Sequence, residues 1–467
     1  MLLGACTDRP SAGTDATTTG EATAGSETTA SSSETGASST TVDASSSDAT
    51  DSTDTGGPTD TDPDTDTTGE PEPACDEISF KSAVLEQKVR SALELPEGPI
   101  SPEALLTLTV FDASLGDRIK HLDGIECAKE LVDLDLTQED LEEVGPLRWL
   151  KKLEVLDLAN NDFAIYTGGL EPLRDLDALR YLSLADTDVA TIEELGTLDS
   201  LEVLHLDYCR VKDLAPLTAV TTLRELHLWN NMVAELSPLA AMPKLEQLDL
   251  HKNPVADLAP LADLPALTVL DVGQSEVTSL DPLASVATLE VLRADQAEIS
   301  AVHLGAHPKL RELWLSQNHV DDLSGLAQLS ALTLLYAGFN EITDLSPLAG
   351  LSALETLLVE FNAVSDLSPV ASLPLVTVVA AGNMISDVTP LAGIPTLRWI
   401  DLSGNLISDI SAFAAPAWTD LDCLRLDLNE NPLNAEAVDV IIPALCAQGA
   451  VVSWSEQSCN DQCIPVP

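Results

Sequence analysis

Aromatic residues, basic residues and long apolar runs are all scarce in this sequence. Aromatic residues make up 3% of its 467 residues, and 22 Lys and Arg stand against 77 Asp and Glu, for a formal net charge of −55. Such a charge repels phosphate groups, which excludes nucleic acid and bare anionic membranes as partners. Because no long run of apolar residues occurs, no segment is predicted to cross a bilayer as a helix.

The motifs of common catalytic sites are missing as well. The sequence contains no Gly-x-Ser-x-Gly elbow, no His-Glu-x-x-His pair, no phosphate-cradling glycine loop and no dinucleotide fingerprint. We therefore predict no catalytic residues and no cofactor, and we interpret the chain as a protein that is not an enzyme.

The N-terminal part differs in composition from the rest. Residues 7–74 hold thirty Ser or Thr, fifteen acids and one base. Such a segment buries too little apolar surface to offset its ordering entropy, so it is predicted to be a disordered tether. Residues 1–6, "MLLGAC", resemble the end of a bacterial lipoprotein signal, in which Cys6 receives the lipid. Since only five residues precede Cys6, we expect the true start to lie upstream; the alternative is a chance match in a cytosolic chain.

A repeat of about 22 residues fills most of the remaining chain. Its pattern, LxxLxLxxNxIxDLxPLxxL, occurs in fourteen units. The first positions of the units are Leu131, Leu153, Leu179, Leu201, Leu223, Leu245, Leu267, Leu289, Leu310, Leu332, Leu354, Leu375, Leu397 and Cys423. Alternation at positions 3 to 7 predicts a short strand with positions 4 and 6 pointing inward.

Two further positions of the unit indicate how the units stack. Position 9 is Asn in nine units, and an inward Asn can hydrogen-bond the backbone of neighbouring turns. The Asp or Ser followed by Pro in the second half favours a short helical turn. A single unit cannot bury enough apolar surface to fold alone, so the units are predicted to form one solenoid with a parallel sheet.

These units resemble the leucine-rich repeats of internalin-like bacterial surface proteins. Residues 78–126 resemble the helical N-terminal cap of such proteins, and residues 431–454 resemble their closing helix and strand. The resemblance implies an α/β solenoid with a parallel sheet on the concave face, short helical turns on the convex face and a helical N-terminal cap. The expected domains are a cap with a degenerate first repeat (75–130), the repeats (131–431) and a C-terminal cap with cysteines (432–467).

The remaining cysteines are interpreted by their positions. Cys209 occupies position 9, where this repeat family accepts Cys in place of Asn, and we interpret it as structural. Cys75 and Cys127 flank the N-terminal cap, and four others share the C-terminal end: Cys423, Cys446, Cys459 and Cys463. Disulfides at both ends are typical of an exported protein, and a C-terminal zinc site is the alternative. We expect an exported lipoprotein of the cell envelope, anchored in the outer membrane and exposed at the surface.

The few aromatic residues gather at positions predicted to face outward. Positions 3, 5, 7 and 8 of each unit should lie on the concave face. The chain has six Trp, four Tyr and six Phe, and chance would place about two of these sixteen residues at such positions. Eight are found there: Tyr181, Tyr208, Trp229, Trp314, Tyr336, Phe339, Phe361 and Trp399. Exposed aromatic residues on a rigid sheet are typical anchors of a recognition surface. Alternatively, the three at position 8 (Tyr208, Phe339 and Phe361) only cover the core.

Three histidines join this predicted ligand-binding set. His205 and His227 share position 5 on adjacent units, and His251 follows at position 7. Two imidazoles and a nearby carboxylate can hold a divalent metal, but no orienting groups are evident from the sequence, and we predict ligand contact without a metal. The sequence thus predicts a tethered protein that binds a protein or glycan through its concave face. The alternatives are a self-assembling envelope protein and a metal-dependent enzyme that uses these histidines.

Overall fold

The computed structural model describes residues 71–460, except residues 96, 115–117, 162–168, 301, 415–417, 419–420 and 422–423. All of these residues belong to one compact unit, Asp64–Pro467. Cys6 and residues 7–70 of the predicted tether lie outside the described residues, as do Cys423 and Cys463.

One sheet runs through the described part of the chain. Each strand from β1 to β15 pairs in parallel with the next strand in sequence, and β17 pairs antiparallel with β16. In every repeat unit the strand covers positions 3 to 5. The strands are β1 (Val110–Asp112), β2 (Asp133–Asp135), β3 (Val155–Asp157), β4 (Tyr181–Ser183), β5 (Val203–His205), β6 (Glu225–His227), β7 (Gln247–Asp249), β8 (Val269–Asp271), β9 (Val291–Arg293), β10 (Glu312–Trp314), β11 (Leu334–Tyr336), β12 (Thr356–Leu358), β13 (Thr377–Val379), β14 (Trp399–Asp401), β15 (Arg425–Asp427), β16 (Val451–Trp454) and β17 (Gln457–Ser458).

Short turns of 3₁₀ helix return the chain from one strand to the next. They are Ile125–Cys127, Gly145–Trp149, Glu171–Leu173, Glu193–Thr197, Ala215–Ala219, Ser237–Ala241, Ala259–Leu261, Asp281–Ser285, Ser324–Leu326, Ser346–Gly350, Ser368–Val370 and Ser411–Ala414. Before one of these turns, the Asp344 carboxylate accepts the Ser346 N–H at 2.7 Å, which positions the chain for the turn. The residue that caps this turn is Leu345, so Asp344 acts from the position before the expected helix cap.

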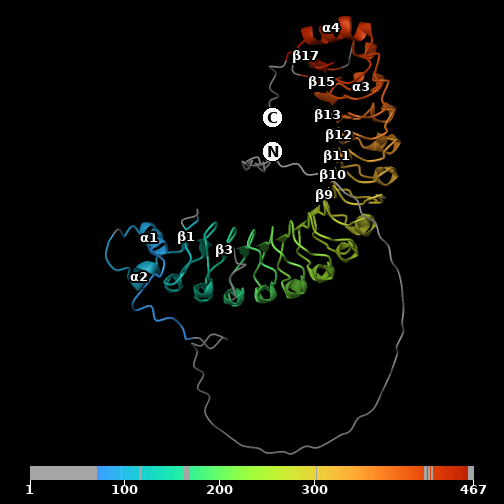
Figure 1. Ribbon diagram of the computed structural model, residues 1–467. Helices are drawn as coiled ribbons and strands as arrows, with labels where there is room; N and C mark the ends of the chain where they lie inside the picture. Colours follow the sequence, from blue (N-terminus) through green and yellow to red (C-terminus); the bar gives the residue numbers. More distant parts are fainter. Residues whose placement is uncertain are drawn as a thin grey trace, which may run out of the picture. The chain divides into compact units, whose positions relative to one another are not determined.

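The α- and π-helices lie mainly at the two ends. They are α1 (Ala83–Ala92) and α2 (Pro102–Leu105) in the N-terminal cap, α3 (Thr389–Ala392) in a late repeat, and a π-helix (Ala437–Ile441) that continues into α4 (Ile442–Ala447). Figure 1 shows the sheet along the concave side of the solenoid and the short turns along the convex side. The predicted fold class is confirmed.

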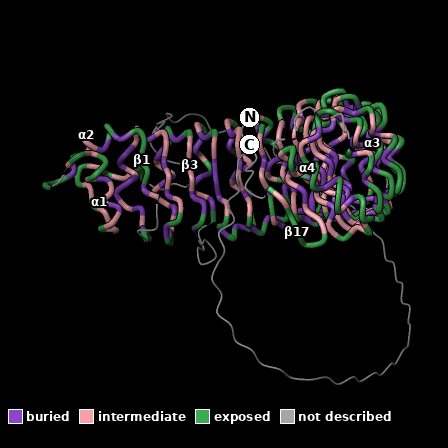
Figure 2. The backbone as a smooth tube through the Cα atoms, turned by 90° about the horizontal axis from the view of Figure 1, so that it is seen from above, coloured by how far each residue is buried: buried purple, intermediate pink, exposed green. Residues whose placement is uncertain are grey.

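The core consists of columns of aliphatic side chains from successive units. Leu226 and Leu228, at positions 4 and 6, have no exposed surface, and the equivalent residues of the other units are buried in the same way. In Figure 2 these buried segments alternate with exposed turns along the solenoid. One of these aliphatic columns includes an imidazole: His307 is fully buried where the other units mostly place Leu, Val, Ile or Met.

The position-9 side chains form the predicted ladder between units. The Asn340 amide nitrogen donates to the carbonyls of Leu315 (2.8 Å), Ala337 (3.2 Å) and Gly338 (3.1 Å). Its oxygen accepts the N–H of Val320 at 2.9 Å. Each such Asn therefore joins two adjacent units and satisfies backbone groups that no strand partner reaches.

Residues other than Asn occupy the same position in several units. Cys209 is a buried free thiol that donates to the Leu184 carbonyl at 3.1 Å, which confirms its structural placement. Glu139 fills position 9 of the first unit, and its buried carboxylate accepts the Ile119 N–H at 2.7 Å. This carboxylate thus ties the first repeat to the N-terminal cap.

Disulfides close both ends of the described solenoid. Cys75 is bonded to Cys127, and Cys446 is bonded to Cys459. The expectation of disulfides at both ends is confirmed for these two pairs. Within the part of the chain that the structure describes, no helix has the length and apolar character needed to span a bilayer.

Candidate functional site

The eleven residues predicted to bind a ligand all lie on the strands or in the turns that leave them. Five are exposed: Tyr208, Trp229, Phe339, Phe361 and Trp399. The other six are half-buried: Tyr181, His205, His227, His251, Trp314 and Tyr336. We refer to this strand side, formed by positions 3, 5, 7 and 8, as the concave face.

Six of these residues form one patch across β4 to β7, which we call the central cluster: Tyr181, His205, Tyr208, His227, Trp229 and His251. Along position 5, the His205 and His227 rings stack with centroids 4.3 Å apart and planes 7° from parallel. The Tyr181 ring lies 5.5 Å from the His205 ring. The pairing register of β5 and β6 causes this stacking, because it places the two histidines directly opposite each other.

The second half of the central cluster lies at positions 7 and 8. The Trp229 ring is 4.8 Å from the Tyr208 ring and meets the His251 ring edge to face at 5.8 Å. Trp229 keeps 37% of its surface exposed although Leu228, the residue directly before it, is buried. The indole is therefore available to a ligand and is not part of the core.

Acidic side chains surround these rings. Burial raises the pKa of the Asp249 carboxyl to about 6, and the neighbouring carboxylates of Asp271 and Asp207 add to the shift. A hydrogen bond with Asp271, at 3.4 Å, raises the pKa of His251. By contrast, burial lowers the pKa of His227, and the adjacent His205 contributes to that shift. The central cluster thus combines aromatic surface with carboxylates that outnumber the charged groups of opposite sign beside them.

Position 8 has a left-handed backbone in every repeat unit. This includes Tyr208, Phe339 and Phe361, with φ of 53°, 57° and 53°. The alternative that position-8 aromatic residues tuck into the turn does not describe these three, because their exposed fractions are 42%, 43% and 53%. A bulky residue in this conformation costs about 1–2 kcal/mol relative to glycine. The rings gain little core contact that would offset the cost.

A second group of aromatic residues lies on β10 and β11. The Trp314 and Tyr336 rings meet edge to face at 5.5 Å, and the Arg293 guanidinium lies 5.9 Å from the Trp314 ring. Among the described residues, Trp314 Nε1 and Glu360 Oε2 are buried without a hydrogen-bond partner. We did not predict Arg293 or Glu360 from the sequence, although their shared register with the aromatic residues was the available signal.

The remaining predicted residues are not in one place. Phe339 and Phe361 stack on each other at 4.5 Å. Trp399 lies two units further along, beside a hollow of about 300 Å³ that Asp401, Arg425 and Asp427 also line. The concave face therefore carries separate aromatic patches and no single pocket that contains all eleven residues.

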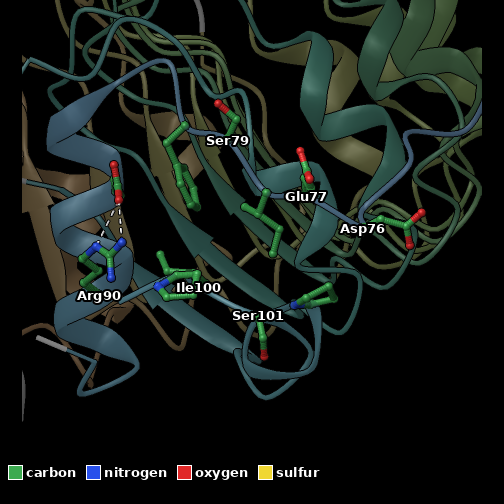
Figure 3. Close-up of a pocket in the computed structure, with 11 residues that line it drawn as sticks. Asp76, Glu77, Ser79, Arg90, Ile100 and Ser101 are labelled. Carbon is green, nitrogen blue, oxygen red and sulfur yellow. Dashed lines mark hydrogen bonds and ion pairs between the residues drawn. The ribbon is translucent and has the colours of Figure 1, made fainter. Parts of the chain in front are cut away.

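A larger hollow, of about 590 Å³, lies at the N-terminal cap (Figure 3). Its lining includes Asp76, Glu77 and Arg90. The Arg90 guanidinium is paired with the Glu86 carboxylate through nitrogen–oxygen distances of 2.7 and 3.0 Å. With one base among three acids, this hollow shares the acidic character of the whole chain, and the concave face, which adds clustered aromatic rings, is the stronger candidate.

Known proteins place the solenoid in a family. A leucine-rich repeat region matches residues 131–373, more than half of the chain. An internalin (inlF) from Listeria monocytogenes is 28% identical, with a TM-score of 0.61, over 72% of this chain and 93% of that one. A Leptospira interrogans leucine-rich repeat protein shares the fold at 21% identity and a TM-score of 0.67, over 75% of this chain and 97% of that one. No curated protein matches. The chain belongs to the leucine-rich repeat family, and its repeats are internalin-like.

Proposed function

We propose that this chain is a non-catalytic binding protein that holds a protein ligand on its concave face. The observation that carries the proposal is the central cluster, where Tyr208, Trp229 and His251 are held on a rigid sheet and remain accessible. Solenoids of this kind use extended concave surfaces for recognition. Aromatic residues supply large contact areas at low entropic cost, which makes them frequent anchors of protein interfaces.

The charge of the patch indicates the character of the partner. Asp207, Asp249 and Asp271 lie beside the aromatic rings, and the formal charge of the whole chain is −55. A partner with a basic, partly apolar surface would complement both properties, since opposite charges steer encounters and aromatic contacts slow dissociation. We therefore favour a basic protein surface; a glycan ligand would bind with little dependence on salt.

The location of the protein is the second part of the proposal. The two disulfides and the internalin-like repeats suggest an extracellular or surface protein. We infer that lipid on Cys6 and the Ser- and Thr-rich tether hold the solenoid at the cell surface. Mass spectrometry of the protein from membranes should find Cys6 as the lipidated N-terminal residue, and Cys6→Ser should move the protein to the soluble fraction. An unmodified Cys6 in the mature protein would contradict the anchor.

The binding role is tested by capture with matched variants. The full chain, Trp229→Ala and Met232→Ala are immobilised and exposed to envelope fractions and to lysates of neighbouring cells. Met232 is a suitable control because it is a large apolar residue of the same unit, 54% exposed, outside the concave positions. A partner retained by the wild type and by Met232→Ala but lost by Trp229→Ala supports the proposal. Equal capture by all three contradicts it.

A further inference from the structure

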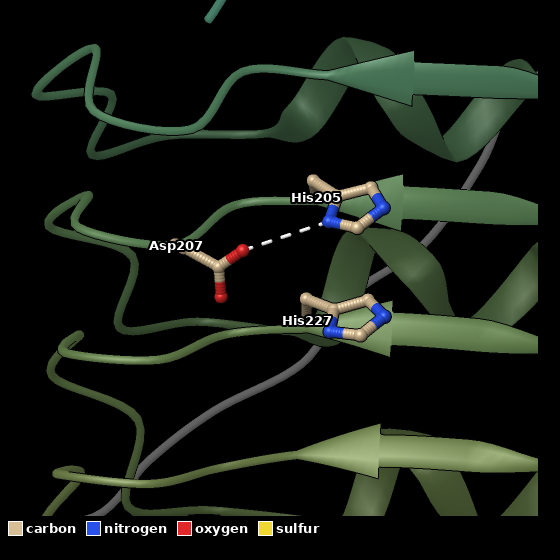
Figure 4. Close-up of side chains that lie close together, drawn as sticks. All are labelled: His205, Asp207 and His227. Atoms are coloured by element: carbon tan, nitrogen blue, oxygen red, sulfur yellow. Dashed lines mark ion pairs between the residues drawn. The ribbon is translucent and has the colours of Figure 1, made fainter. Parts of the chain in front are cut away.

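His205, His227 and Asp207 form a compact group at the carboxyl ends of β5 and β6 (Figure 4). The His205 Nδ1 atom is 3.6 Å from the Asp207 Oδ2 atom. One ligand atom from each of the three residues lies within 4.8 Å of those of the other two. Their side chains keep 27%, 25% and 20% of their surface exposed, in the order His205, His227 and Asp207, so the group remains open to solvent.

The chemistry of this group is that of a transition-metal site. Neutral imidazole nitrogens and carboxylate oxygens are common ligands of zinc and of neighbouring divalent metals. Bonds of about 2.0–2.2 Å to such a metal place tetrahedral ligand atoms roughly 3.3–3.6 Å apart. The His205–Asp207 distance already meets this requirement, and the second imidazole needs to move by about 1 Å, which rotation of a half-exposed side chain allows.

The surroundings orient the three groups. The backbone N–H of Trp229 donates to Asp207 Oδ1 at 2.9 Å, which fixes the carboxylate and leaves Oδ2 directed at His205. The two rings are held side by side by the strand register, and Tyr181 packs against the far side of His205. Figure 4 shows one nitrogen of each ring on the side of the Asp207 carboxylate. The bond from the Trp229 N–H to Asp207, which was not evident from the sequence, is the kind of orienting contact that metal ligands generally have around them.

We propose that His205, His227 and Asp207 bind one divalent transition-metal ion of the zinc class. Three protein ligands leave at least one coordination position open toward the concave face, as in zinc sites that take an exogenous ligand. The proposal goes beyond partner binding and does not depend on it, because the ion is bound by this chain alone. It replaces the interpretation of the two histidines as simple contact residues.

A second group of candidate ligands provides an internal comparison. His121, Asp123 and Glu143 also lie close together, with His121 and Glu143 3.2 Å apart. This group contains one imidazole, and carboxylates alone discriminate poorly in favour of zinc over hard cations. His319 is another reference, because it lies exposed between Glu298 and Glu341 at 3.4 and 3.5 Å, with carboxylates but no second imidazole. Neither should bind zinc as tightly.

The test is zinc titration of the metal-free full chain. Any affinity tag is removed, free thiols are alkylated, and binding of Zn²⁺ is measured by calorimetry for the wild type and for His205→Gln, His227→Gln, His121→Gln and His319→Gln. We expect one zinc ion per chain with a dissociation constant of about 10 µM or lower. His205→Gln and His227→Gln should weaken this binding by about tenfold or more, whereas the two control variants should leave it unchanged.

A measurement on the wild type makes the result independent of how the variants fold. X-ray absorption of the zinc-loaded chain should count two imidazole ligands and oxygen, with no sulfur. The proposal is overturned if the wild type binds zinc no more tightly than about 100 µM, if His227→Gln binds as well as the wild type, or if the absorption spectrum shows one imidazole or sulfur.

Discussion

The rings of Phe339 and Phe361 stack on adjacent units, with centroids 4.5 Å apart and planes 24° from parallel, while both residues hold a left-handed backbone. Two later units place Gly382 and Gly404 at the same position, where this conformation carries no steric cost. The phenylalanines therefore stand where a smaller residue would be less strained. Position 8 is left-handed in every unit, so the conformation alone marks no site; the two adjacent bulky rings at this position agree with the binding role proposed for the concave face.

Phe339→Asn should change the free energy of unfolding by no more than about 1 kcal/mol. The variant loses an exposed ring contact worth about 0.5–1.5 kcal/mol, but Asn tolerates the left-handed conformation and removes much of the strain. Urea denaturation measures the change. Leu335→Ala, at a fully buried position of the same unit, is the control and should cost about 2–5 kcal/mol. Equal losses in the two variants would show that Phe339 is part of the core.

Asn340→Ala should destabilise the solenoid by about 1–3 kcal/mol, because the N–H of Val320 loses its side-chain partner, whereas the carbonyl of Leu315 keeps the Asn318 amide as a donor. Equilibrium denaturation is again the measurement. The control is a substitution at position 9 of another unit. Cys209→Asn introduces the usual ladder residue there and should be neutral or mildly stabilising. A loss of more than about 1 kcal/mol in Cys209→Asn would contradict an interchangeable ladder position.

The buried imidazole of His307 should make the fold sensitive to acid. Burial lowers the pKa of His307 in the folded chain, so the unfolded chain binds more protons below its usual pKa of about 6.5. The stability that comes from keeping the His307 imidazole neutral is fully present above about pH 6.5, and it is lost as the pH falls toward the lower pKa of the folded chain. The His307 Nε2 atom bonds the Leu283 carbonyl at 3.1 Å, and that carbonyl also accepts the N–H of Val286 at 2.9 Å.

His307→Leu leaves this carbonyl with a donor and restores the aliphatic column. We expect the variant to be at least as stable as the wild type at pH 5.5 and to lose less stability between pH 7.5 and pH 5.5. Guanidinium denaturation at the two pH values checks this. An identical pH dependence in both proteins would show that other groups cause the acid sensitivity.

The disulfide between Cys75 and Cys127 closes a long segment, with a sequence separation of 52. Removing it with Cys75→Ser and Cys127→Ser together should cost about 2–4 kcal/mol, because the unfolded chain regains conformational freedom. The shorter Cys446–Cys459 separation of 13 predicts a smaller loss. Thermal unfolding of the two double variants measures both effects, and an unchanged melting temperature in the first would contradict a stabilising role of the cap disulfide.

The repeat pattern was sufficient to predict the backbone. Leucines at positions 4 and 6, and the ladder residue at position 9, occur at fixed offsets within each unit, so the register placed residues such as Asn340 and Cys209 correctly. Glu139 and His307 were not anticipated, because each replaces the usual residue of its column and the pattern treats such a residue as an irregularity. Each is buried with polar partners: Glu139 accepts the Ile119 N–H and pairs with Lys88, and His307 bonds the Leu283 carbonyl.

For the candidate site, the sequence predicted which residues are neighbours but not how their side chains are oriented. The register indicated that His205 and His227 are neighbours, but the direction of their rings depends on Tyr181 and on the Asp207 carboxylate held by Trp229. The contact between Arg293 and Trp314 likewise depends on side-chain rotation across two strands. A sequence pattern with a period of 22 residues carries no information on such angles.

The central claim is that Trp229 contacts a partner and does not stabilise the fold. The most direct measurement is the affinity of the captured partner for the wild type, Trp229→Ala and Met232→Ala, with the melting temperature of each protein recorded in parallel. The account predicts that Trp229→Ala weakens binding by about thirtyfold or more, equivalent to about 2 kcal/mol, while its melting temperature and both properties of Met232→Ala stay close to the wild type. Unchanged affinity together with a large fall in the melting temperature of Trp229→Ala would contradict it.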